Sequence, residues 1–263
     1  MAVLTAIITH LEAPAVRRQL DYLRDLSPAS RFVVCHGGSR AAFEELADED
    51  ALFIDDPSLR GSARQQSYNA ILRAVYEGRV AQDTDIELVY FMEYDHLVLA
   101  SDFERRLEEL AGASPAGLFA KGASRRNDTN WPHFTRYKDD AGINRFFAEL
   151  SCRDDPWARW GCLGSGMLLR REALAALSAV PDPPRVYLEM FIPTLVYHLG
   201  FDVVDVDAVS DLYAGVRWKP EYGRDEVLAY MRAGQAFVHP YKQLVSTVAA
   251  AHVGLNSSKA DLI

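Results

Sequence analysis

The sequence is poor in cysteine and lacks any long apolar run. Its 263 residues include three cysteines, Cys35, Cys152 and Cys162, and none belongs to a CxxC pair. Three scattered cysteines make neither a disulfide framework nor a thiolate zinc site, and they indicate a reducing compartment. No stretch approaches the roughly 18 apolar residues of a membrane span. We therefore expect a cytoplasmic protein without a transmembrane segment.

An excess of positive charge is also absent. Lys and Arg total 28 against 37 Asp and Glu, which gives a net charge of −9. This balance argues against binding to the phosphate backbone of nucleic acids and against docking on anionic lipid. The composition, with 49% hydrophobic and 25% charged residues, is typical of a folded globular protein and excludes disordered, collagen-like and coiled-coil chains.

Short apolar runs rich in β-forming residues alternate with helical patterns along the chain. This alternation predicts βαβ units around a largely parallel sheet, so the expected fold class is α/β. The expected strands cover residues 2–9, 31–35, 51–54, 87–92, 116–120, 166–169 and 203–206. The expected helices cover residues 14–26, 61–76, 101–110, 170–177 and 188–199. Because no internal repeat or linker interrupts the pattern, we expect one domain over residues 1–263.

Residues 122–162 differ in character from the rest of the chain. They mix charges, aromatic residues and turn formers, as in RRNDTNWPHF and CRDDPWARWG. A loop of this length in a compact domain usually forms a binding surface or a lid. We therefore expect a functional insertion here.

Two acidic residues, Glu93 and Asp95, follow an apolar run at residues 88–92. Alternation along an extended chain puts their side chains on the same side. At the carboxyl end of a parallel strand, that side faces the ligand crevice of an α/β sheet. Carboxylate oxygens are hard ligands that suit Mg²⁺ or Mn²⁺. The pair predicts a site for a divalent metal and a diphosphate, against the alternative of a solvated turn at a strand end.

Four short segments occur in the order found in GT-A glycosyltransferases, which transfer sugars from nucleotide diphosphates. Glu93-Tyr94-Asp95 stands at the place of the DxD metal motif, with Glu instead of Asp at its first position. WGCLGSGM at 160–167 stands at the place of the glycine loop on the acceptor side. YLEM at 187–190 stands at the place of the xED motif, and FVHPY at 237–241 stands at the place of the C-terminal histidine. The sequence thus resembles the GT-A family, which implies an α/β/α sandwich.

The resemblance also implies ligands. It implies that residues 1–120 bind a nucleotide-diphospho-sugar donor. Residues 121–263, which include an acceptor-side insertion and a C-terminal extension, are then expected to bind a carbohydrate or glycoconjugate acceptor. A Mn²⁺ or Mg²⁺ ion is expected to be held by Asp95, His239 and Glu93. The residues expected to bind the donor are Thr9, His10, Asp55, Arg60, Arg64, Asn69, Glu93, Tyr94 and Asp95. Those expected to bind the acceptor are Trp131, Trp157, Trp160, Gly164 and Ser165, the tryptophans by stacking on sugar C–H faces.

Glu189 is the expected catalytic residue. In inverting members of the family the acid of the xED motif is the general base, so the resemblance implies that Glu189 takes the proton of the acceptor hydroxyl. The residue after it is Met190, and the second acid of the motif is therefore missing. A retaining mechanism is the alternative.

Three other classes of function share parts of this pattern. A sugar-phosphate nucleotidyltransferase has the same nucleotide-binding half, but it carries a glycine- and basic-rich loop after the first strand, where this chain has THLEA. A noncatalytic nucleotide-sugar-binding module would lack a base such as Glu189. A metal hydrolase normally shows denser ligand pairs than these seven dispersed histidines. A glycosyltransferase is therefore the favoured interpretation.

Overall fold

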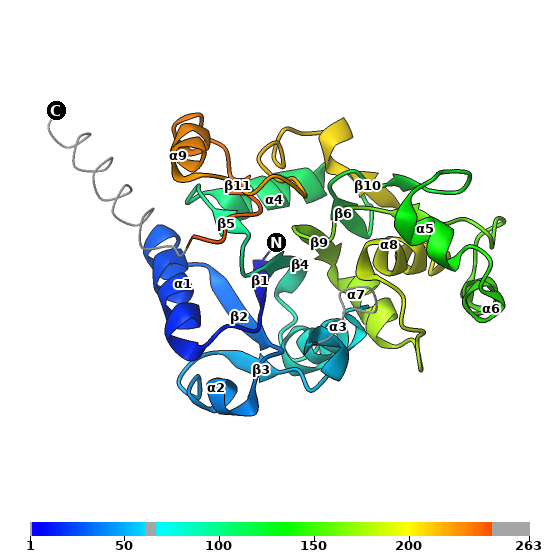
Figure 1. The fold of residues 1–263 in the computed structure, drawn as a ribbon, viewed down its shortest axis with the longest axis horizontal. Helices are drawn as coiled ribbons and strands as arrows, with labels where there is room; N and C mark the ends of the chain where they lie inside the picture. Colours follow the sequence, from blue (N-terminus) through cyan, green and yellow to red (C-terminus); the bar gives the residue numbers. More distant parts are fainter. Residues whose placement is uncertain (1, 61–66, 244–263) are drawn as a thin grey trace, which may run out of the picture.

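A seven-stranded mixed sheet in the order β10-β6-β9-β4-β1-β2-β3 forms the centre of the molecule (Figure 1). The computed structural model describes residues 2–60 and 67–243. The strands of the sheet are β1 (Ala2–Thr9), β2 (Arg31–His36), β3 (Ala51–Phe53), β4 (Ile86–Glu93), β6 (Leu118–Ala120), β9 (Met167–Arg170) and β10 (Val203–Asp205). All neighbouring strands run parallel except β9, which is antiparallel to both β4 and β6. The expected α/β class with a mostly parallel sheet is confirmed.

Helices cover both faces of this sheet. They are α1 (Ala13–Leu26), α2 (Arg40–Glu44), α3 (Asn69–Val75), α4 (Phe103–Gly112), α5 (Pro132–Tyr137), α6 (Ala141–Leu150), α7 (Arg171–Ser178), α8 (Leu188–His198) and α9 (Arg224–Arg232). Short 3₁₀ turns occupy Pro57–Arg60 and Val206–Ala208, and α3 continues into a π-helical turn at Tyr76–Val80. One apolar core joins α1 and α4 to the sheet, and a second joins α3, α7 and α8 to its other face. The expected α/β/α layering is thus present.

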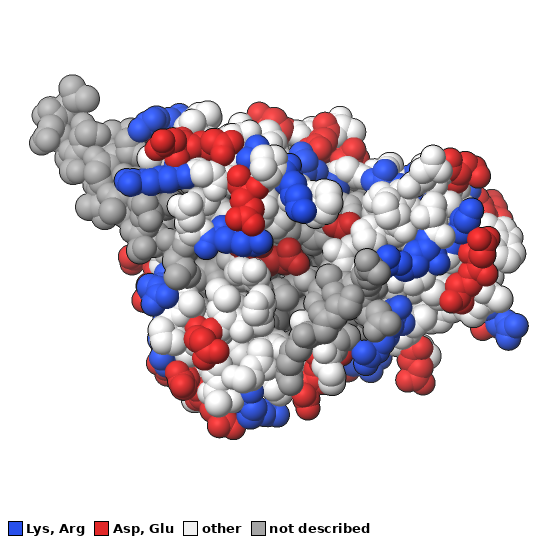
Figure 2. Space-filling model, viewed as in Figure 1, with Lys and Arg blue, Asp and Glu red and all other residues white. Residues whose placement is uncertain are grey.

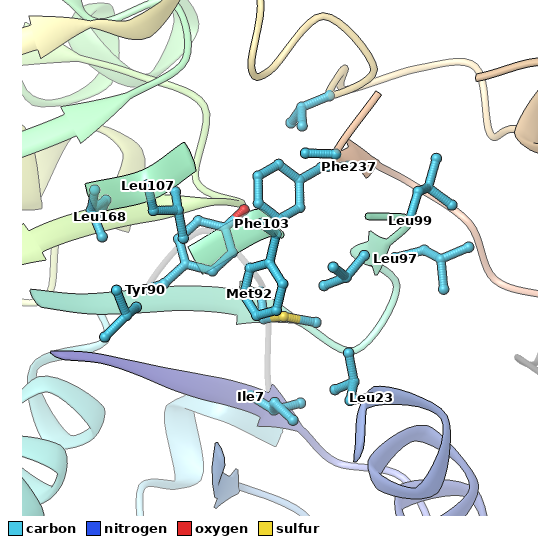
Figure 3. Close-up of a cluster of buried hydrophobic side chains, with 14 of the residues drawn as sticks. Ile7, Leu23, Tyr90, Met92, Leu97, Leu99, Phe103, Leu107, Leu168 and Phe237 are labelled. Carbon is cyan, nitrogen blue, oxygen red and sulfur yellow. The ribbon is translucent and has the colours of Figure 1, made fainter. Parts of the chain in front are cut away.

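The core on the α4 side shows why these segments fold as they do. α1 begins with a proline in its first turn and buries Val16, Leu20 and Leu23 along one side, as an amphipathic helix should. Figure 3 shows Ile7 of β1, Tyr90 and Met92 of β4, and Leu168 of β9 pointing toward Phe103 and Leu107 of α4. Alternate residues of each strand enter each core because side chains alternate across a sheet.

The insertion at residues 122–162 is not the loop that the sequence suggests. Its base is an antiparallel ribbon of β7 (Ser124–Arg125) and β8 (Trp160–Gly161), and it carries α5 and α6. Asp140 caps α6 by accepting hydrogen bonds from Gly142 N and Ile143 N, and Phe147 is fully buried with its ring 6.0 Å from that of Phe191 on α8. The interpretation as a loop is wrong, because this segment contains two helices. Both are short and lie among charged residues and turn formers, so the apolar spacing of α6 does not stand out in the sequence.

A second short ribbon joins distant parts of the chain. β5 (Leu97–Val98) pairs antiparallel with β11 (Phe237–Val238), and Leu99 N donates to Ala236 O at 2.7 Å. Neither strand stands out in the sequence, since each has only two residues. The ribbon brings the segment after β11 against the end of β4.

Two simpler expectations can be compared directly. Cys35, Cys152 and Cys162 are free thiols, of which only Cys152 is exposed. Within the described ranges, no helix is both long and apolar enough to cross a bilayer. The division into a donor half at 1–120 and an acceptor half at 121–263 falls just after β6 and stays a prediction.

Replacing Phe103 tests the importance of the core between α4 and the sheet. Phe103 is fully buried and its ring lies 6.0 Å from that of Phe237. Phe103→Ala should lower the free energy of unfolding by about 3–5 kcal/mol, because it removes buried apolar contacts and leaves a cavity. Urea denaturation measures the loss. Glu109→Ala on the exposed side of the same helix removes only a surface ion pair with Arg105, so it should lower the free energy of unfolding by less than about 1 kcal/mol. Equal losses in both variants would contradict the importance of this core for stability.

Candidate metal and nucleotide-sugar site

Glu93, Asp95 and His239 form a compact group at the carboxyl end of β4. One ligand atom from each residue lies within 4.8 Å of the others. His239 Nε2 is 3.4 Å from Asp95 Oδ1 and 3.6 Å from Glu93 Oε2. Asp95 is 8% and His239 6% exposed, whereas Glu93 is half-buried. The acids that the sequence predicts to lie together therefore do so, and the C-terminal histidine joins them.

The backbone around Asp95 explains how His239 reaches the acids. A turn after β4 is closed by the bond from His96 N to Glu93 O, and Tyr94 N donates to Ile8 O of β1. Beyond the β5–β11 ribbon, Tyr241 N donates to Asp95 O at 2.8 Å. The segment that carries His239 is thus hydrogen-bonded beside the turn that carries Asp95.

Side-chain contacts fix two of the three potential ligands. Tyr68 OH donates to Glu93 Oε1 at 2.6 Å, and Tyr68 has a left-handed backbone, φ 60°, directly before α3. His239 Nδ1 donates to Arg217 O at 2.9 Å, which leaves Nε2 directed at the carboxylates. A ligating histidine normally has such a partner on its second nitrogen, which sets its tautomer and orientation.

The group fits a hard divalent cation. Asp95 Oδ1 is buried, and its contact with His239 Nε2 at 3.4 Å is longer than a normal hydrogen bond. A buried carboxylate oxygen is costly without a closer partner. Burial by itself would lower the pKa of His239, but the Asp95 and Glu93 carboxylates overcome this and raise it to about 9. At neutral pH an imidazolium therefore occupies a place where a cation is stabilised. Two carboxylates and an imidazole suit Mn²⁺, and the oxygens also suit Mg²⁺.

A cavity of about 430 Å³ opens beside this group, within the size range of small-molecule sites. Its lining combines the three potential ligands with Gly164, Ser165, Tyr187, Glu189, Trp218, Lys219, Glu221 and Lys242, among others. Figure 2 shows acidic side chains in a hollow near the middle of the face, with basic side chains at its edge. Six of the residues expected from the sequence thus line one cavity: Glu93, Asp95, Gly164, Ser165, Glu189 and His239.

Glu189 opens α8 at the wall of this cavity. Gly164 N donates to its Oε1 at 3.1 Å, and its backbone oxygen accepts from Cys162 N. A Cβ on Gly164 would lie 2.5 Å from a methyl of Leu188, so a larger residue at this position would require the Leu188 side chain to move. Burial raises the pKa of Glu189 to about 7, although the hydrogen bond from Gly164 lowers it. The carboxyl therefore changes charge near neutral pH, as a general base for a hydroxyl should.

His133 of α5 contacts Glu189 from the insertion. Its Nε2 lies 3.5 Å from Glu189 Oε2, and its ring stacks on Tyr187 at 4.2 Å between centroids. Burial lowers the pKa of His133, and Arg136 adds to this effect, so the ring is neutral at pH 7. The insertion therefore supplies one wall of the Glu189 environment.

A second cavity of about 610 Å³ lies on the other side of Glu93. Its lining includes Ile8, Thr9 and His10 from the end of β1, Gly37 and Gly38 after β2, and Leu59, Tyr68, Glu93 and Tyr94. The His10 and Tyr94 rings meet edge to face at 4.9 Å. This is the crevice outside the carboxyl ends of β1, β2 and β4, where open α/β sheets bind ligands. Thr9, His10, Glu93 and Tyr94, expected from the sequence to bind the donor, line it together.

The remaining expected donor residues are less directly connected. Asn69 opens α3, with its amide donating to Ser67 Oγ, and Asp55 is exposed after β3. Neither lines the two cavities. Arg64 and the side chain of Arg60 lie outside the described residues, so their expected contact with phosphate stays a prediction.

The three tryptophans expected to bind the acceptor are not among the residues that line the cavity with Glu189. Trp131 packs over Gly161, with the Arg126 guanidinium 4.9 Å from its ring centroid. Trp160 packs against Tyr197 at 5.7 Å. Trp157 is 58% exposed and lies outside the lining of this cavity. Their role in acceptor binding stays a prediction.

Sequence analysis missed Tyr68, His133, Tyr187 and Trp218. Tyr68, His133 and Trp218 reach the site through contacts between residues far apart in the chain and belong to none of the four segments. Tyr187 belongs to the YLEM segment, but no role was assigned to it. The signal available for Trp218 is its neighbourhood, Arg217-Trp218-Lys219-Pro220, where charges and a proline flank an aromatic residue and indicate an exposed turn.

Substitution of the potential metal ligands tests the site. With saturating UDP or GDP present, Asp95→Ala should abolish Mn²⁺ binding, since it removes the buried carboxylate of the group, and His239→Gln should weaken it. The amplitude of the free-Mn²⁺ signal in electron paramagnetic resonance measures both. Asp21→Ala on the exposed side of α1 is the control and should bind like the parent. Parent-like Mn²⁺ affinity in a folded Asp95→Ala protein would exclude the metal assignment.

Comparison with known proteins gives no match to a family model and no match to a curated protein sequence. The structure is nevertheless similar to several solved glycosyltransferases.

One is a mannosyltransferase from Pyrobaculum calidifontis, solved with GDP-Man and Mn²⁺, at 19% identity and a TM-score of 0.43 over 77% of this chain and 54% of that one. Another is glucosyl-3-phosphoglycerate synthase from Mycobacterium tuberculosis, solved with Mn²⁺, UDP-glucose and phosphoglyceric acid, at 16% identity and 0.43 over 95% and 79%. An active-site mutant of LgtC is similar at 15% identity and 0.42 over 98% and 96%. All three TM-scores are below 0.5, so the function has to be inferred from the chain's own site.

Proposed function

We propose that this chain is a metal-dependent glycosyltransferase of the GT-A type. It transfers a sugar, of the hexosyl class, from a nucleotide diphosphate to a hydroxyl of a carbohydrate or glycoconjugate. The observation that carries the proposal is the position of the Glu93, Asp95 and His239 group, because Glu93 lines both cavities. A donor with its nucleoside in one cavity and its sugar in the other has its diphosphate at that group.

The residues around the nucleoside cavity have the chemistry for the donor. The apolar wall of Ile8 and Leu59 and the rings of His10 and Tyr94 suit a flat base, and the glycines after β2 allow its close approach. Glu93 and Asp95 then face the diphosphate. A divalent metal bound there offsets the negative charge on the leaving diphosphate.

Glu189 serves as the general base in this proposal. The acceptor oxygen forms a bond to the anomeric carbon, the bond from that carbon to the diphosphate oxygen breaks, and the hydroxyl proton passes to the Glu189 carboxylate. Direct attack of this kind inverts the anomeric configuration. Gly164 N holds one carboxylate oxygen at 3.1 Å, which leaves the other, beside His133, for the proton.

A thermal-shift panel tests donor binding. UDP-, GDP-, CMP- and dTDP-sugars are added with Mn²⁺ and without it, and one of the nucleotide-diphospho-sugars should raise the melting temperature in a Mn²⁺-dependent way, because a ligand that binds only the folded state stabilises it. Asp95→Ala should lose this shift. If no donor gives a Mn²⁺-dependent shift of the melting temperature in the parent, the proposed function is contradicted. In a separate product assay, release of nucleoside monophosphate rather than diphosphate from the nucleotide-diphospho-sugar would favour a hydrolase.

Glu189→Gln tests the role of the base with the donor found in that panel. The amide keeps the shape but cannot take a proton, so kcat should fall by about 10²–10⁴-fold at unchanged donor affinity. In the parent, kcat should fall as the pH decreases below about 7, because the protonated carboxyl is inactive, and should be level above it. In Glu189→Gln, the decrease of kcat below about pH 7 should be absent. Glu149→Gln on the exposed side of α6 is the control; a decrease of only severalfold in Glu189→Gln would favour a retaining mechanism.

A further inference from the structure

Trp218 is an exposed aromatic residue at the mouth of the cavity that contains Glu189. Among the described residues, the exposed large hydrophobic side chains are Trp157, Val209 and Trp218, and Trp218 has the largest exposed fraction, 70%. Of these three, Trp218 alone lines the cavity with Asp95 and Glu189. Isolated exposed hydrophobic residues are common, so the feature that distinguishes this indole is its position in the lining of the cavity that contains Asp95 and Glu189.

The backbone that carries Trp218 is firmly connected to the metal group. Arg217 N donates to His239 O at 2.9 Å, and Arg217 O accepts from His239 Nδ1. The Arg217 guanidinium lies 3.6 Å from the centroid of the Tyr222 ring, and its Nε donates to Pro220 O. The indole therefore projects from an ordered turn whose position is tied to that of His239.

The surroundings of the indole are polar. Lys219 Nζ lies 4.6 Å from the Trp218 ring centroid, and at the same rim Lys242 pairs with Glu221 at 2.8 Å. A single flat apolar surface bordered by charged hydrogen-bonding groups matches a pyranose ring, which has an apolar C–H face and a rim of hydroxyls. An acyl chain or an amphipathic helix would require a continuous apolar surface instead.

We propose that Trp218 is the stacking platform for the acceptor and that the acceptor presents a pyranose ring to it. This inference rests on the proposed function. Trp218 and Glu189 line the same cavity, whereas the nucleoside cavity lies beyond Glu93 and does not include Trp218. The indole therefore lies on the side from which a hydroxyl approaches the base. Lys219, Glu221 and Lys242 supply the donors and acceptors that select the ring's hydroxyl pattern.

The experiment uses the full chain loaded with Mn²⁺ and with whichever of UDP or GDP binds. Methyl glycopyranosides of glucose, galactose, mannose and N-acetylglucosamine are the probes, and acyclic sorbitol, which has no flat face, is the control ligand. Saturation-transfer NMR titrations at millimolar concentration measure affinity. At least one pyranoside should bind in preference to sorbitol, and its ring C–H protons should receive the strongest saturation.

Three variants separate stacking from other effects. Trp218→Leu, which keeps apolar bulk but removes the aromatic face, should weaken pyranoside binding by about tenfold. Trp218→Phe should retain most of the affinity, and Val209→Ser, at an exposed hydrophobic residue outside this cavity, should bind pyranosides like the parent. Nucleotide affinity in the presence of Mn²⁺ should be the same in all three, which shows that each variant is folded.

The outcomes distinguish this inference from the proposed function. If UDP or GDP binds with Mn²⁺ but no pyranoside binds better than sorbitol, or if Trp218→Leu binds pyranosides like the parent, the platform is excluded while the function stands. If neither nucleotide binds the parent but pyranosides bind through Trp218, the proposed donor chemistry fails and the sugar platform remains.

Discussion

The approach of His239 to Asp95 is the contact on which the site depends. It is made by the antiparallel pairing of β5 and β11, which continues as the hydrogen bond from Tyr241 N to Asp95 O. Phe237 in this ribbon packs between Tyr90 of β4 and Phe103 of α4, so the ribbon is anchored in the core that Figure 3 shows. The position of His239 beside Asp95 thus depends on the apolar packing of Phe237 next to it in the chain.

The acids of the site differ in their partners. Glu93 and Asp95 share His239, whose pKa their negative charge raises to about 9, whereas Glu189 has one backbone N–H and a neutral histidine beside it. Desolvation therefore raises the pKa of Glu189 to about 7. Within one region the fold provides a cation-binding pair and a carboxyl that can exchange a proton near neutral pH. The proposed metal-dependent sugar transfer uses both kinds of acid.

The arrangement of the cavities follows from the sheet. The crevice at the ends of β1, β2 and β4 leads to Glu93, and beyond it the cavity is built from the segment before β9, the start of α8 and the segment around Trp218. β9 runs antiparallel to β4, so the glycine-containing segment that precedes β9 lies at the same edge of the sheet as the end of β4. One reversed strand therefore brings Gly164 and Ser165 next to Asp95.

The sequence by itself determined the α/β class, the seven strands of the sheet to within two residues at each end, and the local segments that carry Glu93, Asp95, Gly164 and Glu189. These features have a short-range cause, since hydrophobic period, glycine content and strand-end acids are visible within about ten residues. Tertiary structure decided the rest. The two-residue strands β5 and β11, the bond from Tyr68 to Glu93, and the separation of Trp157 from the cavity that Trp218 lines all depend on pairs of segments far apart in the chain. Such pairs leave no periodic pattern in either segment, because their free energy comes from mutual burial once the sheet has closed.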